Sequence, residues 1–150
     1  MKNPRPARVL FLCTGNSCRS QMAEGWARHL FPGSVEPFSA GTLAKGLDPR
    51  AVKVMAEAGV DISCRRSKTL AELPGGGFDL VITVCDKARE SCPLFPGRTR
   101  RLHRSFDDPP FLARDAKDEE DALKPYRRVR DELRAFVETL PAILDQENAR

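Results

Sequence analysis

A cysteine and an arginine lie six positions apart in a short polar stretch, at Cys13 and Arg19. A guanidinium group offers planar, bidentate donors that match a tetrahedral oxyanion, and a cysteine thiolate is a strong nucleophile. A loop that curls around an oxyanion between these residues would bring donors and nucleophile together. We expect Ser20 to donate a hydrogen bond to the Cys13 thiolate and to stabilise it. The stretch therefore predicts a nucleophilic, oxyanion-binding loop.

The residues on either side of this stretch predict a strand before it and a helix after it. The apolar run 9–12 is typical of a strand buried on both faces, and Met22, Trp26 and Leu30 recur at four-residue steps. The loop then opens a helix N-terminus, where free N–H groups and the helix dipole favour an anion and a thiolate. The predicted oxyanion-binding residues are Thr14, Gly15, Asn16, Ser17, Cys18, Arg19 and Ser20.

A second pair of cysteines, Cys85 and Cys92, brackets the polar segment 86–91. If this segment is helical, its seven steps rise about 10 Å, which exceeds the reach of a disulfide. The segment would have to unwind for the two sulfurs to bond, and its polar composition gives it little apolar surface to resist opening. Taken alone, the pair is better explained as two small core residues. Beside a reactive Cys13, we interpret it as a redox pair.

The run Cys-Thr-Gly-Asn-Ser-Cys-Arg-Ser-Gln-Met-Ala-Glu-Gly, which begins at Cys13, resembles the signature of thioredoxin-coupled arsenate reductases. The resemblance extends to residues 39–41, to Cys85 and Cys92, and to the run Phe-Asp-Asp-Pro at 106–109. Those enzymes share their fold with low-molecular-weight protein tyrosine phosphatases. The resemblance implies a three-layer α/β fold, in which helices flank a four-stranded parallel sheet and a Cys-x5-Arg loop binds phosphate.

The resemblance also implies a reaction sequence without a cofactor. Cys13 attacks arsenate held by the loop and Arg19, while Asp108 protonates the leaving oxygen. Cys85 then attacks the sulfur of Cys13 and arsenite leaves. Cys92 next attacks Cys85, and thioredoxin reduces the resulting disulfide. Asp-Asp-Pro-Pro is also a common turn composition, in which either carboxylate would simply cap a loop. The resemblance favours Asp108 as the acid, and Asp107 is the alternative.

The main alternative is a phosphatase, since the same loop with an aspartic acid hydrolyses phosphate monoesters. Gln21 stands where such phosphatases usually have proline, and the single tyrosine, Tyr126, is not beside an Asp-Pro motif. Hydrolysis also gives Cys85 and Cys92 no role. We therefore expect a reductase with weak residual phosphatase activity. A metal site built from the five cysteines is disfavoured, because no Cys-x-x-Cys spacing is present.

Some relatives hold a potassium ion beside the loop with an asparagine, a glutamate, a serine and an aspartate. Asn16, Glu24 and Ser39 match the first three, and Lys68 stands at the fourth position. The ammonium of Lys68 would replace the ion, so we expect no bound metal and no effect of potassium on activity. Of the remaining cysteines, we expect Cys18 to pack at the helix start, and we assign Cys64 no role.

Composition predicts one soluble domain over residues 1–150, with 41% hydrophobic and 31% charged residues. No apolar stretch has the length of a signal peptide or a membrane span, and five cysteines point to reduced thiols, so we expect a cytoplasmic protein. The basic cluster 98–104 lacks interleaved aromatic residues, and we interpret it as a solvated strand edge. We expect a monomer that binds arsenate and thioredoxin, but neither nucleic acid nor membrane. Glutaredoxin with a small thiol, or a mycothiol system, remains the alternative electron donor.

Alternating strands and helices predict a parallel, doubly wound sheet. The expected strands are 8–12, 35–39 (at an edge, because of Pro37), 78–84 and 100–103. The expected helices are 18–31, 49–58, a short one within 67–73, 86–91, and a long one from Tyr126 that bends or ends at Pro141. We interpret the acidic run 115–121 as a mobile surface loop. Cys13, Ser39 and Cys85 follow or end strands, so they should meet at one edge of the sheet.

Overall fold

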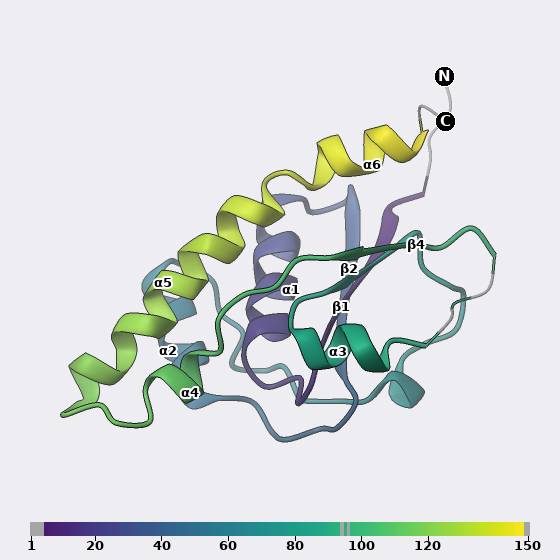
Figure 1. Ribbon diagram of the computed structural model, residues 1–150. Helices are drawn as coiled ribbons and strands as arrows, with labels where there is room; N and C mark the ends of the chain where they lie inside the picture. The colour runs from purple at the N-terminus through teal and green to yellow at the C-terminus, as the bar shows by residue number, and fades with distance from the viewer. Residues whose placement is uncertain (1–4, 94, 96, 149–150) are drawn as a thin grey trace.

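The computed structural model describes residues 5–93, 95 and 97–148. Within this part of the chain, four strands form a parallel sheet in the order β2-β1-β3-β4. The strands are β1 (Ala7–Cys13), β2 (Val35–Gly41), β3 (Leu80–Thr83) and β4 (Arg100–His103). The helices are α1 (Arg19–Leu30), α2 (Pro49–Glu57), the 3-10 helix η1 (Leu70–Glu72), α3 (Asp86–Ser91), α4 (Pro109–Leu112), α5 (Glu119–Val137) and α6 (Leu140–Asn148) (Figure 1). The predicted parallel sheet with flanking helices is confirmed.

The strand order explains the hydrophobic patterns of the sequence. The inner strands are β1 and β3, in which residues 9–13 and 80–83 are all buried, as expected for parallel strands covered on both faces. The outer strands are β2 and β4. The prediction of an edge strand around Pro37 is therefore confirmed, and the basic residues of β4 do lie on the opposite edge.

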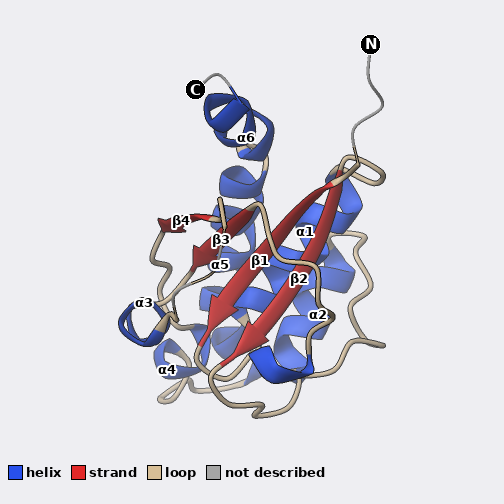
Figure 2. Ribbon diagram, turned by 90° about the vertical axis from the view of Figure 1, so that its right-hand side faces the viewer, coloured by secondary structure: helices blue, strands red, loops and turns tan. Residues whose placement is uncertain are grey.

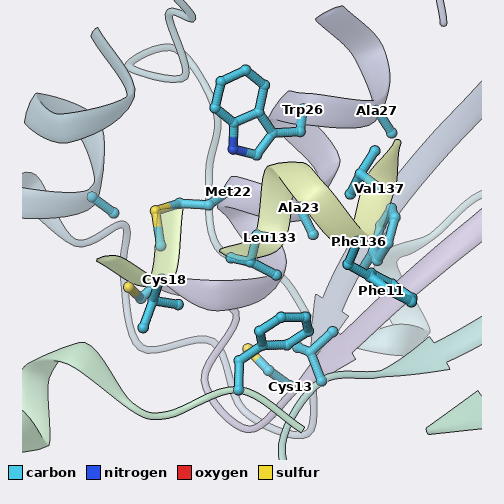
Figure 3. Close-up of a cluster of buried hydrophobic side chains, with 14 of the residues drawn as sticks. Phe11, Cys13, Cys18, Met22, Ala23, Trp26, Ala27, Leu133, Phe136 and Val137 are labelled. Carbon is cyan, nitrogen blue, oxygen red and sulfur yellow. The ribbon is translucent and has the colours of Figure 1, made fainter. Parts of the chain in front are cut away.

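The core that fixes the functional loop lies between α1, α5 and the sheet. In Figure 2, α1, α2 and α5 lie behind the strands, and Figure 3 shows side chains of α1 and α5 meeting above Phe11. Trp26 is 1% exposed and Leu133 is fully buried, and each such burial stabilises the fold by about 1.5–3 kcal/mol. The indole N–H of Trp26 donates to the carbonyl oxygen of Arg130 at 3.0 Å. These contacts hold α1 against α5.

The carboxyl ends of the inner strands lie side by side. In the parallel register, Leu12 pairs with Thr83 and Cys13 pairs with Gly41. Cys13 and Cys85 therefore reach the same edge, as predicted. Ser39 lies two residues inside β2, because that strand continues to Gly41.

The prediction for the acidic run is wrong in part, because α5 begins at Glu119 instead of near Tyr126. The Asp118 carboxylate caps the helix by accepting a hydrogen bond from the N–H of Asp121 at 2.8 Å. Acidic residues in the first turn also interact favourably with the helix dipole. Pro125 lies inside the helix, where burial of the neighbouring residues Ala122 and Leu123 offsets its missing N–H.

Three further boundaries differ from the expectations. The short helix expected within 67–73 is reduced to η1, which begins after a capping box formed by Thr69 and Glu72. The helix α4 is an element that the sequence does not predict. Its start, Asp-Pro-Pro, is a common turn composition, but proline is also favourable in a first helical turn. The long helix ends at Val137, before Pro141, which lies in the first turn of α6. Among the described residues, no helix is long and apolar enough to cross a membrane.

Candidate active site

The loop between β1 and α1 forms one wall of a cavity of about 200 Å³, which we call the Cys13 cavity. Cys13 is the last residue of β1 and Arg19 is the first residue of α1, so the loop connects the strand directly to a helix N-terminus. Lys45, Asp108 and Pro110 complete the lining. The structure thus places the predicted nucleophile and the predicted guanidinium in one cavity.

The predicted contact between Ser20 and Cys13 is present, with 2.9 Å between Oγ and Sγ. The Ser20 oxygen also accepts a hydrogen bond from Nδ2 of Asn16 at 2.9 Å. A Cys13 thiolate carries no proton, so in the thiolate form the Ser20 hydroxyl is the donor of this contact. Hydrogen bonding of this kind favours the charged form of a thiol. The contact therefore supports a nucleophilic Cys13.

Asn16 holds the loop in shape. It has a positive φ of 49°, a conformation that asparagine tolerates better than most residues, and it is fully buried. Its side-chain oxygen accepts hydrogen bonds from the backbone N–H of Lys68 at 2.9 Å and from Nε2 of Gln21 at 3.0 Å. Asn16 therefore links the loop to α1 and to the segment that follows α2.

Asp108 faces the Cys13 cavity, and its neighbour Asp107 does not line it. One terminal nitrogen of Arg19 lies 3.6 Å from the Asp108 carboxylate, and the other donates to the carbonyl oxygen of Phe106 at 2.8 Å. The Asp107 carboxylate is instead paired with Arg128 on α5 at 3.0 Å. The geometry therefore favours Asp108 over Asp107 as the group that reaches a bound oxyanion.

The second cysteine pair brackets α3, as the sequence suggested. Cys85 caps the helix through a hydrogen bond from the N–H of Ala88 to its sulfur at 3.4 Å, and Cys92 follows the last residue. The sulfur of Cys85 also lies 3.3 Å from the hydroxyl of Thr14, which belongs to the oxyanion loop. Cys85 is 4% exposed, whereas Cys92 is more accessible. Thr14 thus connects the second cysteine pair to the loop of Cys13.

The carboxylate of Glu24, whose side chain is 5% exposed, is surrounded by cations. Oε2 lies 2.8 Å from Arg28 and 3.9 Å from Arg65, and Oε1 lies 4.0 Å from the ammonium of Lys68. Ser39 donates its hydroxyl proton to Oε1 at 2.6 Å. A further cation would be repelled by these charges, so the residues present do not fit a potassium ion.

Lys68 lies at the place expected for a substitute cation. Its side chain is 18% exposed. Burial lowers the pKa of the Lys68 ammonium below the ordinary lysine value, while the negative charge of Glu24 acts in the opposite direction. That Lys68 takes over the role of an ion stays a prediction.

Cys18 is 3% exposed and precedes α1, so the expectation that it packs at the helix start is confirmed. Burial raises the pKa of its thiol well above the ordinary value, which keeps it protonated and unreactive. Cys64 is exposed and lies outside the residues that line the Cys13 cavity. Neither thiol contributes a nucleophile to the site.

Sequence reasoning missed two groups that reach the loop. Tyr126 on α5 donates its hydroxyl proton to the Asp48 carboxylate at 2.7 Å, and the N–H of Asp48 donates to the carbonyl oxygen of Ser17 at 2.9 Å. Burial and the contact with Asp48 raise the pKa of Tyr126, so this hydroxyl remains a donor. The other group is Lys45. Its stretch has no periodicity or motif, so the sequence held no signal for it.

Comparison with known proteins places this site in a family. Residues 8–148 match the model of the low molecular weight phosphotyrosine protein phosphatase family. An arsenate reductase of Bacillus subtilis (strain 168) is 46% identical over 135 residues, which cover 87% of this chain and 95% of that protein. A solved arsenate reductase in an oxidized state is 30% identical, with a TM-score of 0.74 and coverage of 91% of this chain and 98% of that chain.

A thioredoxin-dependent arsenate reductase of Corynebacterium glutamicum is a further structural neighbour. It is 25% identical, with a TM-score of 0.69, and the match covers 95% of this chain and 64% of that chain. The family model extends over residues 8–148, a range that includes the loop, Cys85, Cys92 and Asp108, and the similarity to the Bacillus subtilis protein covers 87% of the chain. The chain belongs to the low molecular weight phosphotyrosine protein phosphatase family.

Proposed function

We propose that this protein reduces arsenate to arsenite with electrons from thioredoxin. The observation that carries the proposal is the contact of 3.3 Å between Thr14 in the oxyanion loop and the sulfur of Cys85. It places a second thiol beside the loop of the nucleophile Cys13. Hydrolysis of a phosphate ester uses one thiol, whereas reduction of arsenate needs two electrons and a partner for the first sulfur.

In the proposed sequence, the Cys13 thiolate attacks arsenic(V) bound between the loop and Arg19. A sulfur–arsenic bond forms and one oxygen leaves as water, with a proton from Asp108. Cys85 then attacks the sulfur of Cys13, and the electron pair of the sulfur–arsenic bond stays on arsenic, which is released as arsenite. The product on the enzyme is a Cys13–Cys85 disulfide.

Opening of α3 brings Cys92 to Cys85. Attack by Cys92 frees Cys13 and leaves a Cys85–Cys92 disulfide, which the dithiol of thioredoxin reduces. The polar surface of α3, in which Ala88 is the buried residue, supports such opening. The proposal includes a monomer in the cytoplasm, where thiols are kept reduced, in keeping with five free cysteines.

The test is arsenate-dependent NADPH oxidation in the presence of thioredoxin and thioredoxin reductase. Turnover should be lost in Cys13→Ser, Cys85→Ser and Cys92→Ser, and retained in Cys64→Ser, a control at an exposed cysteine outside the site. Retained turnover in Cys85→Ser or Cys92→Ser would contradict the relay.

A phosphatase is the alternative function, because Cys13, Arg19 and Asp108 line the same cavity and suffice for hydrolysis. We expect hydrolysis of an aryl phosphate to be weak. If it is instead the main activity, depends on Cys13 and is unaffected by changes at Cys85 and Cys92, the phosphatase function is correct.

A further inference from the structure

Lys45 is the second cation of the Cys13 cavity. It lies in the connection between β2 and α2, and lines the cavity together with Asp108 and Arg19. The backbone N–H of Lys45 donates to the carbonyl oxygen of Gly15 at 3.0 Å, and the N–H of Leu43 donates to that of Thr14 at 3.0 Å. The segment that bears Lys45 is therefore tied to the oxyanion loop at two points.

The side chain of Lys45 crosses the oxyanion loop at Gly15. Its aliphatic carbons pass directly over this glycine, so that a Cβ atom built on it would lie 2.8 Å from Cδ and 3.0 Å from Cγ of Lys45. A side chain at position 15 would therefore displace the lysine from this position. The absence of a side chain at Gly15 thus gives the lysine its path across the loop.

The ammonium of Lys45 forms no ion pair with the described residues. Within the described part of the chain, no carboxylate lies within ion-pair distance of its ammonium. Arg19, in contrast, lies 3.6 Å from Asp108, which offsets part of its charge. An oxyanion in the cavity would therefore meet one partly neutralised cation and one free cation.

We infer that Lys45 is a substrate-binding residue that favours dianionic tetrahedral oxyanions. Arsenate is largely a dianion near neutral pH, and its approach to a Cys13 thiolate is opposed by like charge. The ammonium of Lys45 reduces that repulsion. Arsenous acid, the product of the proposed reaction, is uncharged, so Lys45 strengthens binding of the substrate without retaining the product. This inference deepens the proposed function, on which its kinetic part rests.

The first test is kinetic and compares Lys45→Met, Lys45→Arg and Lys124→Met with the parent protein. Lys124 is an exposed lysine on α5 and serves as the matched control. In Lys45→Met, the KM for arsenate should rise about 2- to 5-fold while kcat changes less than about twofold, the range expected for one exposed charge. Lys45→Arg should restore KM. The difference in KM between Lys45→Met and the parent should become smaller as the concentration of sodium chloride is raised, because salt screens the charge of the ammonium.

The second test does not depend on arsenate reduction. Inorganic phosphate bound in the Cys13 cavity should protect Cys13 from a neutral alkylating agent, and the rate of modification of the Cys13 peptide at a series of phosphate concentrations, followed by mass spectrometry, gives the Kd for phosphate. Lys45→Met should raise this Kd by a similar factor of about 2 to 5, with no change in Lys124→Met. An unchanged Kd, or equal changes in both variants, would overturn the inference. If the parent binds phosphate through Lys45 but does not turn over arsenate, the proposed function fails and the inference stands.

Discussion

His103, the last residue of β4, contacts Asp86, the first residue of α3, with 3.0 Å between Nε2 and the carboxylate. Its other ring nitrogen lies 2.7 Å from the hydroxyl of Thr83 at the end of β3. The side chain therefore links the sheet to the helix that must open before Cys85 and Cys92 can bond. Because Ala88 is the buried residue of α3, little apolar burial adds to this link.

We expect Asp86→Ala to open α3 more easily. The change removes the contact with His103 and an acidic residue from the first helical turn, which together stabilise the helix by about 0.5–1 kcal/mol. The Cys85–Cys92 disulfide should therefore form about 2- to 5-fold faster after a single turnover, as measured by acid quench, alkylation and mass spectrometry. Glu90→Ala, an exposed change on the same helix, is the control. Equal rates in the two variants would show that the contact does not restrain α3.

Ser20→Ala should slow the first chemical step. The Ser20 oxygen lies 2.9 Å from the Cys13 sulfur, and a hydrogen bond from this hydroxyl to a charged thiolate would contribute about 1.5–3 kcal/mol. We expect kcat/KM for arsenate to fall at least about 10-fold, and alkylation of Cys13 at neutral pH to slow in parallel. Ser34→Ala, at an exposed serine outside the site, is the control. Unchanged alkylation would mean that Ser20 does not stabilise the thiolate.

The sequence predicted the parts of the site that are local in the chain. The strand, the loop and the helix that hold Cys13 and Arg19 are contiguous, so turn residues and periodicity locate them. The strand pattern also predicted that Cys13 and Cys85 meet at one edge of the sheet, but it could not predict individual contacts between distant segments. The contact between Thr14 and Cys85, 71 positions apart, depends on the pairing of β1 with β3.

The prediction was wrong at two places where the same residue composition fits both a loop and the start of a helix. The acidic run before Tyr126 resembles a solvated loop, yet the same charges suit the first turn of a helix once Asp118 caps it. Asp-Pro-Pro after Asp107 resembles a turn and instead begins α4. In both places, tertiary packing decides between the two structures.

Asp79 should make stability depend on acid pH. Its carboxylate accepts two hydrogen bonds of 2.9 Å from Arg5 and one of 2.8 Å from the backbone N–H of Arg8. The side-chain hydrogen bond with Arg5, followed by the backbone N–H of Arg8, lowers the pKa of Asp79 below its ordinary value of 3.8. A lowered carboxyl pKa in the folded state means that this stabilisation is complete above pH 3.8 and is lost as pH falls through the folded-state pKa.

We therefore expect Asp79→Asn to lower the free energy of unfolding by about 1 kcal/mol at neutral pH, since the contacts are partly exposed to solvent. The difference in the free energy of unfolding between the parent and Asp79→Asn should become smaller as the pH falls below 3.8, the ordinary pKa of aspartate, because the Asp79 carboxylate of the parent then loses its charge. Urea unfolding at a series of pH values measures it. If the difference in the free energy of unfolding stays constant down to the lowest pH at which both proteins fold, the effect comes from packing and not from charge.

Activity should not respond to potassium, because Lys68, Arg28 and Arg65 already surround the carboxylate of Glu24. A further cation would have to displace one of them or accept their repulsion. We expect the same kcat/KM for arsenate in sodium and potassium salts at constant ionic strength. A several-fold increase in potassium would show that the ion binds despite these charges. Lys68→Met tests the cause: removal of the ammonium leaves Glu24 with less positive charge, so a response to potassium should appear in this variant and stay absent from Lys124→Met.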